Sequence, residues 1–231
     1  MRIAVFGANG ATGRLLTGQA LAAGHEVVAA TRRPQNFPLT HDRLTVAAAD
    51  VYDADAVKAC LDGADCVLST LGVPFTRDPI DVYSTGVGNI LAAAGDHRLR
   101  RLVVVSSSAA EPHRHADGGF LLNRVIQPLV TATIGKSTYA DMRRMESLVR
   151  ASGLDWTIVR PSGLFDAPEV SPYDVHEDQA PGVFTSRADL AACLLDQAGD
   201  RAFVHKVLAV TTTHGAPTLF QMLRKEAFKK E

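Results

Sequence analysis

The hydrophobic positions along the chain form short, nearly continuous runs, and most runs are separated by stretches with apolar residues at helical spacing. Runs of this kind are typical of strands that are buried on both faces of a parallel sheet. They predict strands at Ile3–Phe6, Val27–Ala30, Leu44–Ala47, Cys66–Leu68, Leu102–Val105, Thr157–Val159 and Val207–Val210. The periodic stretches predict helices at Thr12–Ala23, Ala54–Leu61, Val82–Ala94, Phe120–Val130, Thr138–Ala151, Arg187–Gln197 and Thr218–Lys229. This alternation predicts an α/β fold with a doubly wound parallel sheet and right-handed crossovers.

The stretch from Pro161 to Pro181 interrupts this alternation because it is rich in proline and aspartate. Irregular loops of this length inside compact domains usually carry function, so we expect this segment to cover or line a site. A chain of 231 residues without an internal repeat, a low-complexity tract or an evident linker can form one large α/β unit. We therefore expect a single domain that spans residues 1–231.

Charge and cysteine usage narrow the classes of partner. The 24 Lys and Arg residues nearly balance the 25 Asp and Glu residues without forming a basic stripe, which argues against nucleic acid and membrane surfaces. The 3 cysteines are odd in number and lie outside metal-ligand spacing, as in proteins of a reducing compartment. The opening stretch has the pattern of a strand rather than a signal peptide, and no apolar run approaches the roughly 18 residues of a membrane span. We expect a cytoplasmic protein, monomeric or homodimeric, that binds small molecules.

A pair of histidines, His113 and His115, raises the question of a metal site. The pair lies in a polar loop without a third ligand in metal-binding spacing, and such pairs are usually solvated. We therefore predict no bound metal.

The segment GANGATG spaces its glycines as G-x-x-G-x-x-G directly between the first predicted strand and the first predicted helix. In such a loop Gly7 permits a tight exit from the strand, Gly10 lets a pyrophosphate approach the backbone, and Gly13 allows close packing of helix on strand. The helix N-terminus then faces the anion. The alternative is a turn without a ligand, but the position in an α/β pattern favours dinucleotide binding. The residues predicted to contact the dinucleotide here are Gly7, Asn9, Gly10, Ala11, Thr12 and Gly13.

The end of the second predicted strand indicates which dinucleotide binds. An acidic residue about 20 positions after the glycine motif would bind the ribose 2′-hydroxyl of NAD, whereas arginine accommodates the 2′-phosphate of NADP. This chain has Thr31, Arg32 and Arg33 there and no acid. We therefore predict NADPH as the cofactor, with Arg32 as the main ligand because a guanidinium can pair with phosphate and stack on adenine. In the alternative, both arginines are solvated surface groups before the turn at Pro34.

The remaining strand ends predict further contacts, because ligands of doubly wound sheets lie outside the carboxyl ends of the strands. The loop after the third strand would flank the adenine, the loop after the fourth would approach the ribose and pyrophosphate, and the loop after the fifth would reach the nicotinamide. The residues at these positions are Asp50 and Val51, then Thr70, Leu71 and Gly72, then Ser106, Ser107 and Ser108. Asp50 could equally cap the following helix, and the serines could equally satisfy the loop backbone.

The most specific feature of the chain is an ordered series of motifs over about residues 1–200, namely VFGANGATG, VVAATRRP, AADVYDADAV, STLG, VVVSSSA, MRRMESLVRASGLDWTIVRPSGL and TSRADLAACLLDQ. This series resembles the atypical short-chain dehydrogenases/reductases of the NAD(P)-binding, NmrA-like and flavin-reductase-like group, which includes biliverdin reductase B. The resemblance implies a Rossmann-type core with NADPH extended along the strand ends and a small substrate-side portion at about residues 161–185 and 200–231. It also implies that Ser108 lies close to the nicotinamide and that Pro161, Ser162 and Leu164 form a substrate wall beside the cofactor.

The resemblance also points to catalytic positions. Ordinary short-chain dehydrogenases use a tyrosine as proton donor, a lysine four residues later that lowers its pKa and holds the ribose, and a serine that orients the carbonyl. At matching positions this chain has Tyr139, Arg143 and Ser108, and the first two share a helix face. Arginine supplies positive charge but cannot release a proton near neutral pH, so Arg143 departs from the family pattern. Lys136 is a further cation at the start of the same helix, and Glu146 is expected to pack that helix onto the sheet.

Two chemical routes and one non-enzymatic function remain open. Carbonyl reduction would use Tyr139 as general acid and Ser108 as carbonyl partner. Hydride transfer to a flavin-like or quinone-like acceptor would need two positioned rings, exclusion of water and a proton from solvent. The leading expectation is an NADPH-dependent oxidoreductase with a small-molecule acceptor. The alternative is an NmrA-like redox sensor that binds NADP without turnover, and a nucleotide-sugar epimerase is weaker because little chain follows Pro161.

Overall fold

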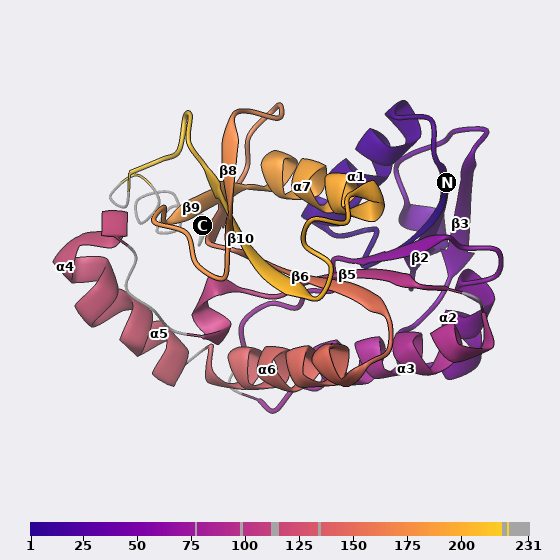
Figure 1. Cartoon of the computed structure of the whole chain (residues 1–231), viewed down its shortest axis with the longest axis horizontal. Helices are drawn as coiled ribbons and strands as arrows, with labels where there is room; N and C mark the ends of the chain where they lie inside the picture. Colours follow the sequence, from indigo (N-terminus) through magenta and orange to yellow (C-terminus); the bar gives the residue numbers. More distant parts are fainter. Residues whose placement is uncertain (77, 98, 112–115, 134, 219–220, 222–231) are drawn as a thin grey trace.

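The computed structural model describes residues 1–76, 78–97, 99–111, 116–133, 135–218 and 221 (Figure 1). The strands are β1 (Arg2–Phe6), β2 (Glu26–Thr31), β3 (Leu44–Ala48), β4 (Cys66–Ser69), β5 (Arg101–Val105), β6 (Asp155–Pro161), β7 (Gly163–Phe165), β8 (Tyr173–Glu177), β9 (Phe184–Ser186) and β10 (Lys206–Thr212). The helices are α1 (Ala11–Ala22), α2 (Ala54–Cys60), α3 (Val82–Asp96), α4 (Gly119–Leu121), α5 (Gln127–Ala132), α6 (Lys136–Ala151) and α7 (Arg187–Gly199).

The main sheet has 8 strands in the order β3-β2-β1-β4-β5-β6-β10-β8. Its neighbouring strands are parallel except for β10 and β8, which are antiparallel. The strand order reverses between β1 and β4, because β2 and β3 extend to one side of β1 whereas β4, β5 and β6 extend to the other. This reversal is the switch point outside which doubly wound sheets bind ligands. The predicted Rossmann-type α/β fold is confirmed.

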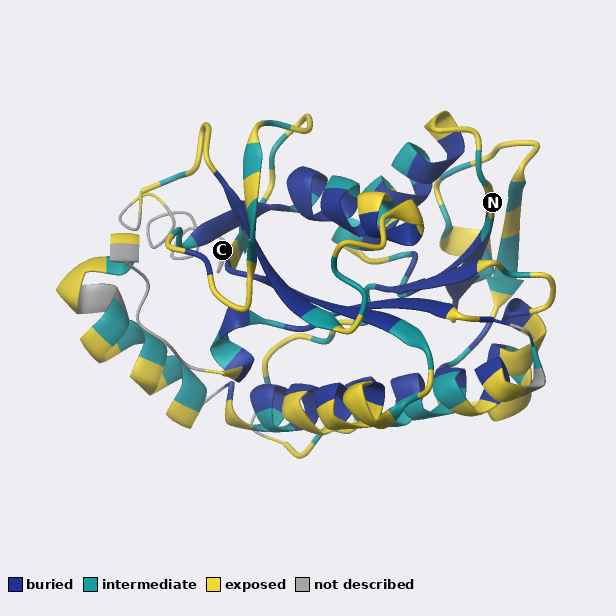
Figure 2. Ribbon diagram, viewed as in Figure 1, coloured by how far each residue is buried: buried dark blue, intermediate teal, exposed yellow. Residues whose placement is uncertain are grey.

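Helices cover both faces of the sheet, with α2, α3 and α6 on one face and α1 and α7 on the other (Figure 1). Successive residues of β1 point to opposite faces, so Phe6 packs in the same cluster as Ile90 of α3, and Val5 packs in the same cluster as Leu16 of α1. Figure 2 shows that the central strands are buried over most of their length. Burial on both faces is therefore why these strands are apolar at nearly every position.

The helix predicted at Phe120–Val130 is present. α4 continues into a π-helical stretch at Leu122–Ile126, and α5 follows with Pro128 in its first turn. Proline lacks the backbone N–H that the regular α-helical pattern uses, and the π-helical turn lies directly before it. The helix predicted at Thr218–Lys229 lies almost entirely outside the described residues.

The stretch expected to be irregular, Pro161 to Pro181, contains two short strands. β7 pairs with β9, and β8 adds to the edge of the main sheet beside β10. In β8 the half-buried Tyr173 and Val175 alternate with the exposed Asp174, as expected of an antiparallel edge strand. Asp189 of α7 anchors the stretch, because its buried carboxylate accepts hydrogen bonds from Ser171 N at 2.7 Å and Ser171 Oγ at 3.0 Å.

Candidate functional site

The loop between β1 and α1 can be built only from glycine at two positions. Gly7 has φ = +75°, and a Cβ there would lie 2.6 Å from the carbonyl oxygen of Thr70. A Cβ on Gly13 would lie 2.8 Å from the Cα of Ala8. The Thr70 hydroxyl fixes the same region by donating to Phe6 O at 3.0 Å. The strand end, the loop and the start of α1 are therefore in direct backbone contact, as a dinucleotide cradle requires.

The N-terminus of α1 carries no anion of its own. Gly10 occupies the N-cap position, no described side chain caps the helix, and its first turn contains no acidic residue. The chain caps other helices: Asp53 accepts from Asp55 N at 3.1 Å at the start of α2, and Ser186 accepts from Asp189 N at 3.0 Å at the start of α7. The open amides and the positive end of the helix dipole fit a pyrophosphate.

Arg32 and Arg33 follow β2, whose end lies beside the end of β1 in the sheet. Thr31 Oγ1 accepts a hydrogen bond from the backbone N–H of Arg33 at 3.3 Å. Both arginine side chains are exposed, and neither guanidinium has a hydrogen bond or ion pair with any residue in the described part of the chain. Both guanidinium groups are therefore available to an anionic ligand at the cradle.

The loops after β3 and β4 rest on α3. Asn89 of α3 donates to Val51 O at 2.7 Å, and a Cβ on Gly86 would lie 2.9 Å from Leu71 Cδ1 and 3.0 Å from Val51 Cβ. Val51 and Leu71 are thus brought together by one helix, and Gly72 is exposed. Asp50 does not cap α2, since its carboxylate accepts from Tyr52 N at 3.1 Å and Asp53 provides the cap.

Tyr139 of α6 is 8% exposed. The ring of Phe75 contacts Tyr139 edge to face, with 5.8 Å between ring centroids. Burial raises the pKa of Tyr139, and the side chain of Ser107 offsets part of this rise. Ser107 also accepts from Ala109 N at 3.2 Å, whereas Ser108 is buried in the 3₁₀ turn Ser108–Ala110. Ser107 is thus the serine that lowers the pKa of Tyr139, and the role of Ser108 beside the nicotinamide stays a prediction.

Arg143 and Glu146 attach α6 to the turn after β5. Arg143 Nη1 donates to Ala110 O at 3.0 Å. Glu146, 1% exposed, forms a two-bond ion pair with Arg160 of β6 (Nε–Oε1 2.9 Å, Nη2–Oε2 2.6 Å), and Arg160 Nη1 also contacts Glu111 Oε2 at 2.6 Å. Burial alone would raise the pKa of Glu146, but Arg160 holds it below its ordinary value. Arg143 thus sits one helical turn from Tyr139 but supports the backbone of the serine turn. Lys136, at the start of α6, is exposed.

The site geometry agrees with a comparison of the sequence with known families. The sequence profile of the NAD(P)H-binding family matches residues 7–201. The chain belongs to this NAD(P)H-binding family. The predicted membership of an NAD(P)-binding family is confirmed.

Individual relatives in the NAD(P)H-binding family share only parts of the chain. An uncharacterized protein of Mycobacterium tuberculosis is 42% identical over 108 residues, which are 46% of this chain and 12% of that protein. The (4-alkanoyl-5-oxo-2,5-dihydrofuran-3-yl)methyl phosphate reductase of Streptomyces griseus is 31% identical over 159 residues, 69% of this chain and 46% of the reductase. The chain therefore spans less than half the length of both relatives.

A solved structure shows the same fold. It is a short-chain dehydrogenase/reductase from Veillonella parvula in complex with NADP, with a TM-score of 0.75 and 19% identity. The match covers 92% of this chain and 95% of that one.

The segments predicted to lie on the substrate side border a cavity of about 370 Å³. Its walls come from Asp117 and Gly118, from Val183 and Phe184 near β9, and from Thr212 at the end of β10. Of the residues predicted to form the substrate wall, Pro161 ends β6 and Leu164 lies in β7. Ser162 lies between these strands and links the two sheets. Its N–H donates to Thr185 Oγ1 at 3.0 Å, and its hydroxyl donates to Gly182 O at 3.1 Å.

Other chemistry is sparse in the described residues. Cys60, Cys66 and Cys193 are buried and without disulfides, and burial raises the pKa of Cys66 and of Cys193 to about 12. The described residues contain no cluster of three or more His, Cys, Asp or Glu side chains suited to a metal ion, and His113 and His115 lie outside them. None of the helices in the described ranges is long and apolar enough to cross a membrane.

Proposed function

We propose that the protein is an NADPH-dependent oxidoreductase that reduces a flavin-, quinone- or carbonyl-type small molecule. The observation that carries the proposal is the juxtaposition, at the carboxyl edge of one sheet, of an uncapped helix N-terminus and two unpaired arginines. The α1 amides would hold the pyrophosphate, and Arg32 with Arg33 would hold the 2′-phosphate. Family membership and the fold shared with an NADP complex support the cofactor.

The described residues favour one chemical route over the other. Bound NADPH supplies the hydride. Burial raises the pKa of Tyr139 further above neutral pH, and the described Arg143 contact goes to a backbone carbonyl. A general acid works best when its pKa lies near the operating pH, so Tyr139 is a weak proton donor in this environment. A flavin- or quinone-type acceptor, which can take its proton from solvent, fits this site better than an unactivated carbonyl.

A second candidate function is an NmrA-like sensor that binds NADP without turnover. The observation that favours it is again Arg143, which occupies the position of the family lysine and supports the Ala110 backbone. A sensor would bind NADPH with the same arginine contacts, but it would not oxidise NADPH with any acceptor.

The test combines binding with turnover. Fluorescence titration should show tighter binding of NADPH than of NADH, and Arg32→Ala should weaken NADPH binding about tenfold, as expected for one charge-assisted hydrogen bond. The control is Arg201→Ala, which removes the same charge at the ion pair with Asp155, at the start of β6. Absorbance at the NADPH band should then fall with flavins, quinones or unsaturated carbonyl compounds. Equal affinity for both dinucleotides would overturn the NADP preference, and absence of oxidation with every acceptor would favour the sensor.

A further inference from the structure

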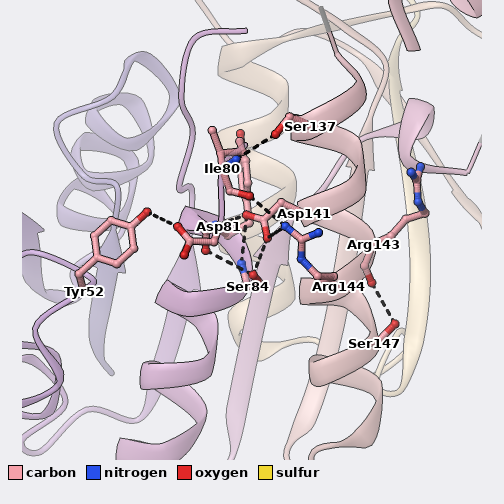
Figure 3. A network of polar contacts seen from close by, with 10 residues as sticks. Tyr52, Ile80, Asp81, Ser84, Ser137, Asp141, Arg143, Arg144 and Ser147 are labelled. Atoms are coloured by element: carbon pink, nitrogen blue, oxygen red, sulfur yellow. Dashed lines mark hydrogen bonds and ion pairs between the residues drawn. The ribbon is translucent and has the colours of Figure 1, made fainter. Parts of the chain in front are cut away.

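Helix α3, which contacts the loops after β3 and β4, is capped at its N-terminus by a residue of α6. Asp141 of α6 is 0% exposed and accepts hydrogen bonds at the N-terminus of α3 from Tyr83 N at 2.8 Å, from Ser84 N at 3.4 Å and from the Ser84 hydroxyl (Figure 3). Asp81 occupies the N-cap position of α3, but its carboxylate accepts from the Tyr52 hydroxyl at 2.7 Å instead. The start of α3 is therefore held by α6.

The segment just before α3 is attached to α6 as well. Ile80 N donates to Ser137 Oγ at 2.9 Å, and Ile80 O accepts from Arg144 Nη2 at 2.9 Å. Arg144 Nη2 also donates to Asp141 Oδ1 at 3.1 Å, so the carboxylate and the guanidinium form one connected group (Figure 3). Arg143 points to the other side of α6 from Asp141 (Figure 3) and takes no part in this group.

The position of α3 in turn sets the position of the cofactor loops. Asn89 of α3 donates a hydrogen bond to Val51 O, and Val51 and Leu71 both pack closely at Gly86 of the same helix. The Tyr83 hydroxyl also accepts a hydrogen bond from Val73 N at 3.4 Å. The loops after β3 and β4 therefore have contacts with the helix that Asp141 caps.

We infer that Asp141 is a positioning residue for NADPH: it fixes the N-terminus of α3 and thereby places the loops after β3 and β4 at the dinucleotide. This inference rests on the proposed function, in which those loops border NADPH. Asparagine at this position would keep one acceptor oxygen but turn an NH₂ group toward N–H or guanidinium donors, leaving buried polar groups unpaired. The N-terminal turn of α3 would shift, and Val51 and Leu71 would move with it.

Asp141→Asn can be tested against a matched control, Asp189→Asn. Asp189 is also 0% exposed and also accepts from a backbone N–H and a hydroxyl, but it lies on α7, on the other face of the sheet. Fluorescence titration with NADPH should show a dissociation constant raised at least tenfold in Asp141→Asn and less than threefold in Asp189→Asn. Thermal unfolding establishes that each variant is folded during the titration. Equal effects in the two variants, or unchanged binding in Asp141→Asn, would overturn the inference while leaving the proposed function intact.

If either aspartate variant fails to fold, two milder substitutions test the same inference. Ser84→Ala removes one hydroxyl from Asp141, and Ser171→Ala removes one hydroxyl from Asp189. About threefold weaker NADPH binding in Ser84→Ala alone supports the inference, and equal effects contradict it. If the wild-type protein binds no NADPH, the proposed function fails and the inference fails with it.

Discussion

The side chain of Ser107 lowers the pKa of Tyr139, while the adjacent Ser108 is buried in the 3₁₀ turn that begins there. Ser107 also accepts a hydrogen bond from Ala109 N, so one side chain connects the tyrosine with the turn after β5. Arg143 supports the same turn through Ala110 O. The tyrosine and the turn are therefore held as one unit by α6.

Replacing Ser107 should affect any proton transfer from Tyr139. Ser107→Ala removes the hydroxyl that lowers the pKa of Tyr139, so the phenol becomes a still weaker acid. With a carbonyl acceptor, kcat should fall about 100-fold, the lower end of the range for one proton-transfer contribution. Ser108→Ala is the control and should change kcat less than threefold. Steady-state kinetics at saturating NADPH measures kcat for both variants. A larger loss of kcat in Ser108→Ala than in Ser107→Ala would identify Ser108 as the serine partner of Tyr139.

The cradle should not tolerate a side chain at Gly7. Gly7→Ala combines the strain of a positive φ with a Cβ 2.6 Å from Thr70 O, and the backbone must shift to relieve the contact. NADPH affinity should fall at least tenfold. Gly24→Ala provides the matched control, because Gly24 also has a positive φ (+89°) but no neighbour within 4 Å. It should lose about 1–2 kcal/mol of stability from left-handed strain alone and bind NADPH normally. Equal losses of affinity would show that strain, rather than the cradle contact, is responsible.

The Glu146–Arg160 pair should make the free energy of unfolding depend on pH in the acidic range. A carboxyl whose pKa is lowered on folding adds stability above its ordinary pKa of 4.5, and this contribution disappears as pH falls through the lower folded-state value. Glu146→Gln should therefore cost about 3 kcal/mol of unfolding free energy near pH 7, because it leaves the buried Arg160 with only the exposed Glu111 as a charge partner. The difference from wild type should shrink in acid, as denaturant unfolding at several pH values would reveal.

The control for this prediction is Glu177→Gln. Glu177 pairs with Lys206 at 2.7 Å, but both side chains are exposed to solvent. Exposed pairs contribute at most about 1 kcal/mol. A loss at Glu146 no larger than the loss at Glu177 would contradict the stabilising role of the buried pair.

The sheet and the cradle could be predicted because their signals are local. The strand IAVF and the glycines that follow it adopt their conformations for reasons visible within a few residues, and the same holds for Thr31 and the two arginines. The edge strand β8 was predicted as an irregular loop, since its alternation is short and flanked by proline. Its pairing with β10 depends on contacts made far along the chain.

The finer features of the site depend on tertiary contacts. Which of three consecutive serines meets Tyr139 is decided by where the turn after β5 begins, and the sequence SSS does not specify that position. Asp141 lies in the middle of a helix, where an aspartate usually faces solvent. Only the docking of α6 against α3 turns it into a cap.

The cap on α3 also has a consequence for the order in which the chain folds. The bonds from Tyr83 and Ser84 to Asp141 span 58 and 57 residues, so the first turn of α3 cannot be completed by its own neighbourhood. Contacts of such separation must first overcome the entropy of closing a long loop. The early strands β1 to β4 can pair before this happens. The cap on α3 is complete only when α6 has formed and docked, so this part of the nucleotide-binding edge depends on a segment that follows it in the chain by more than 50 residues.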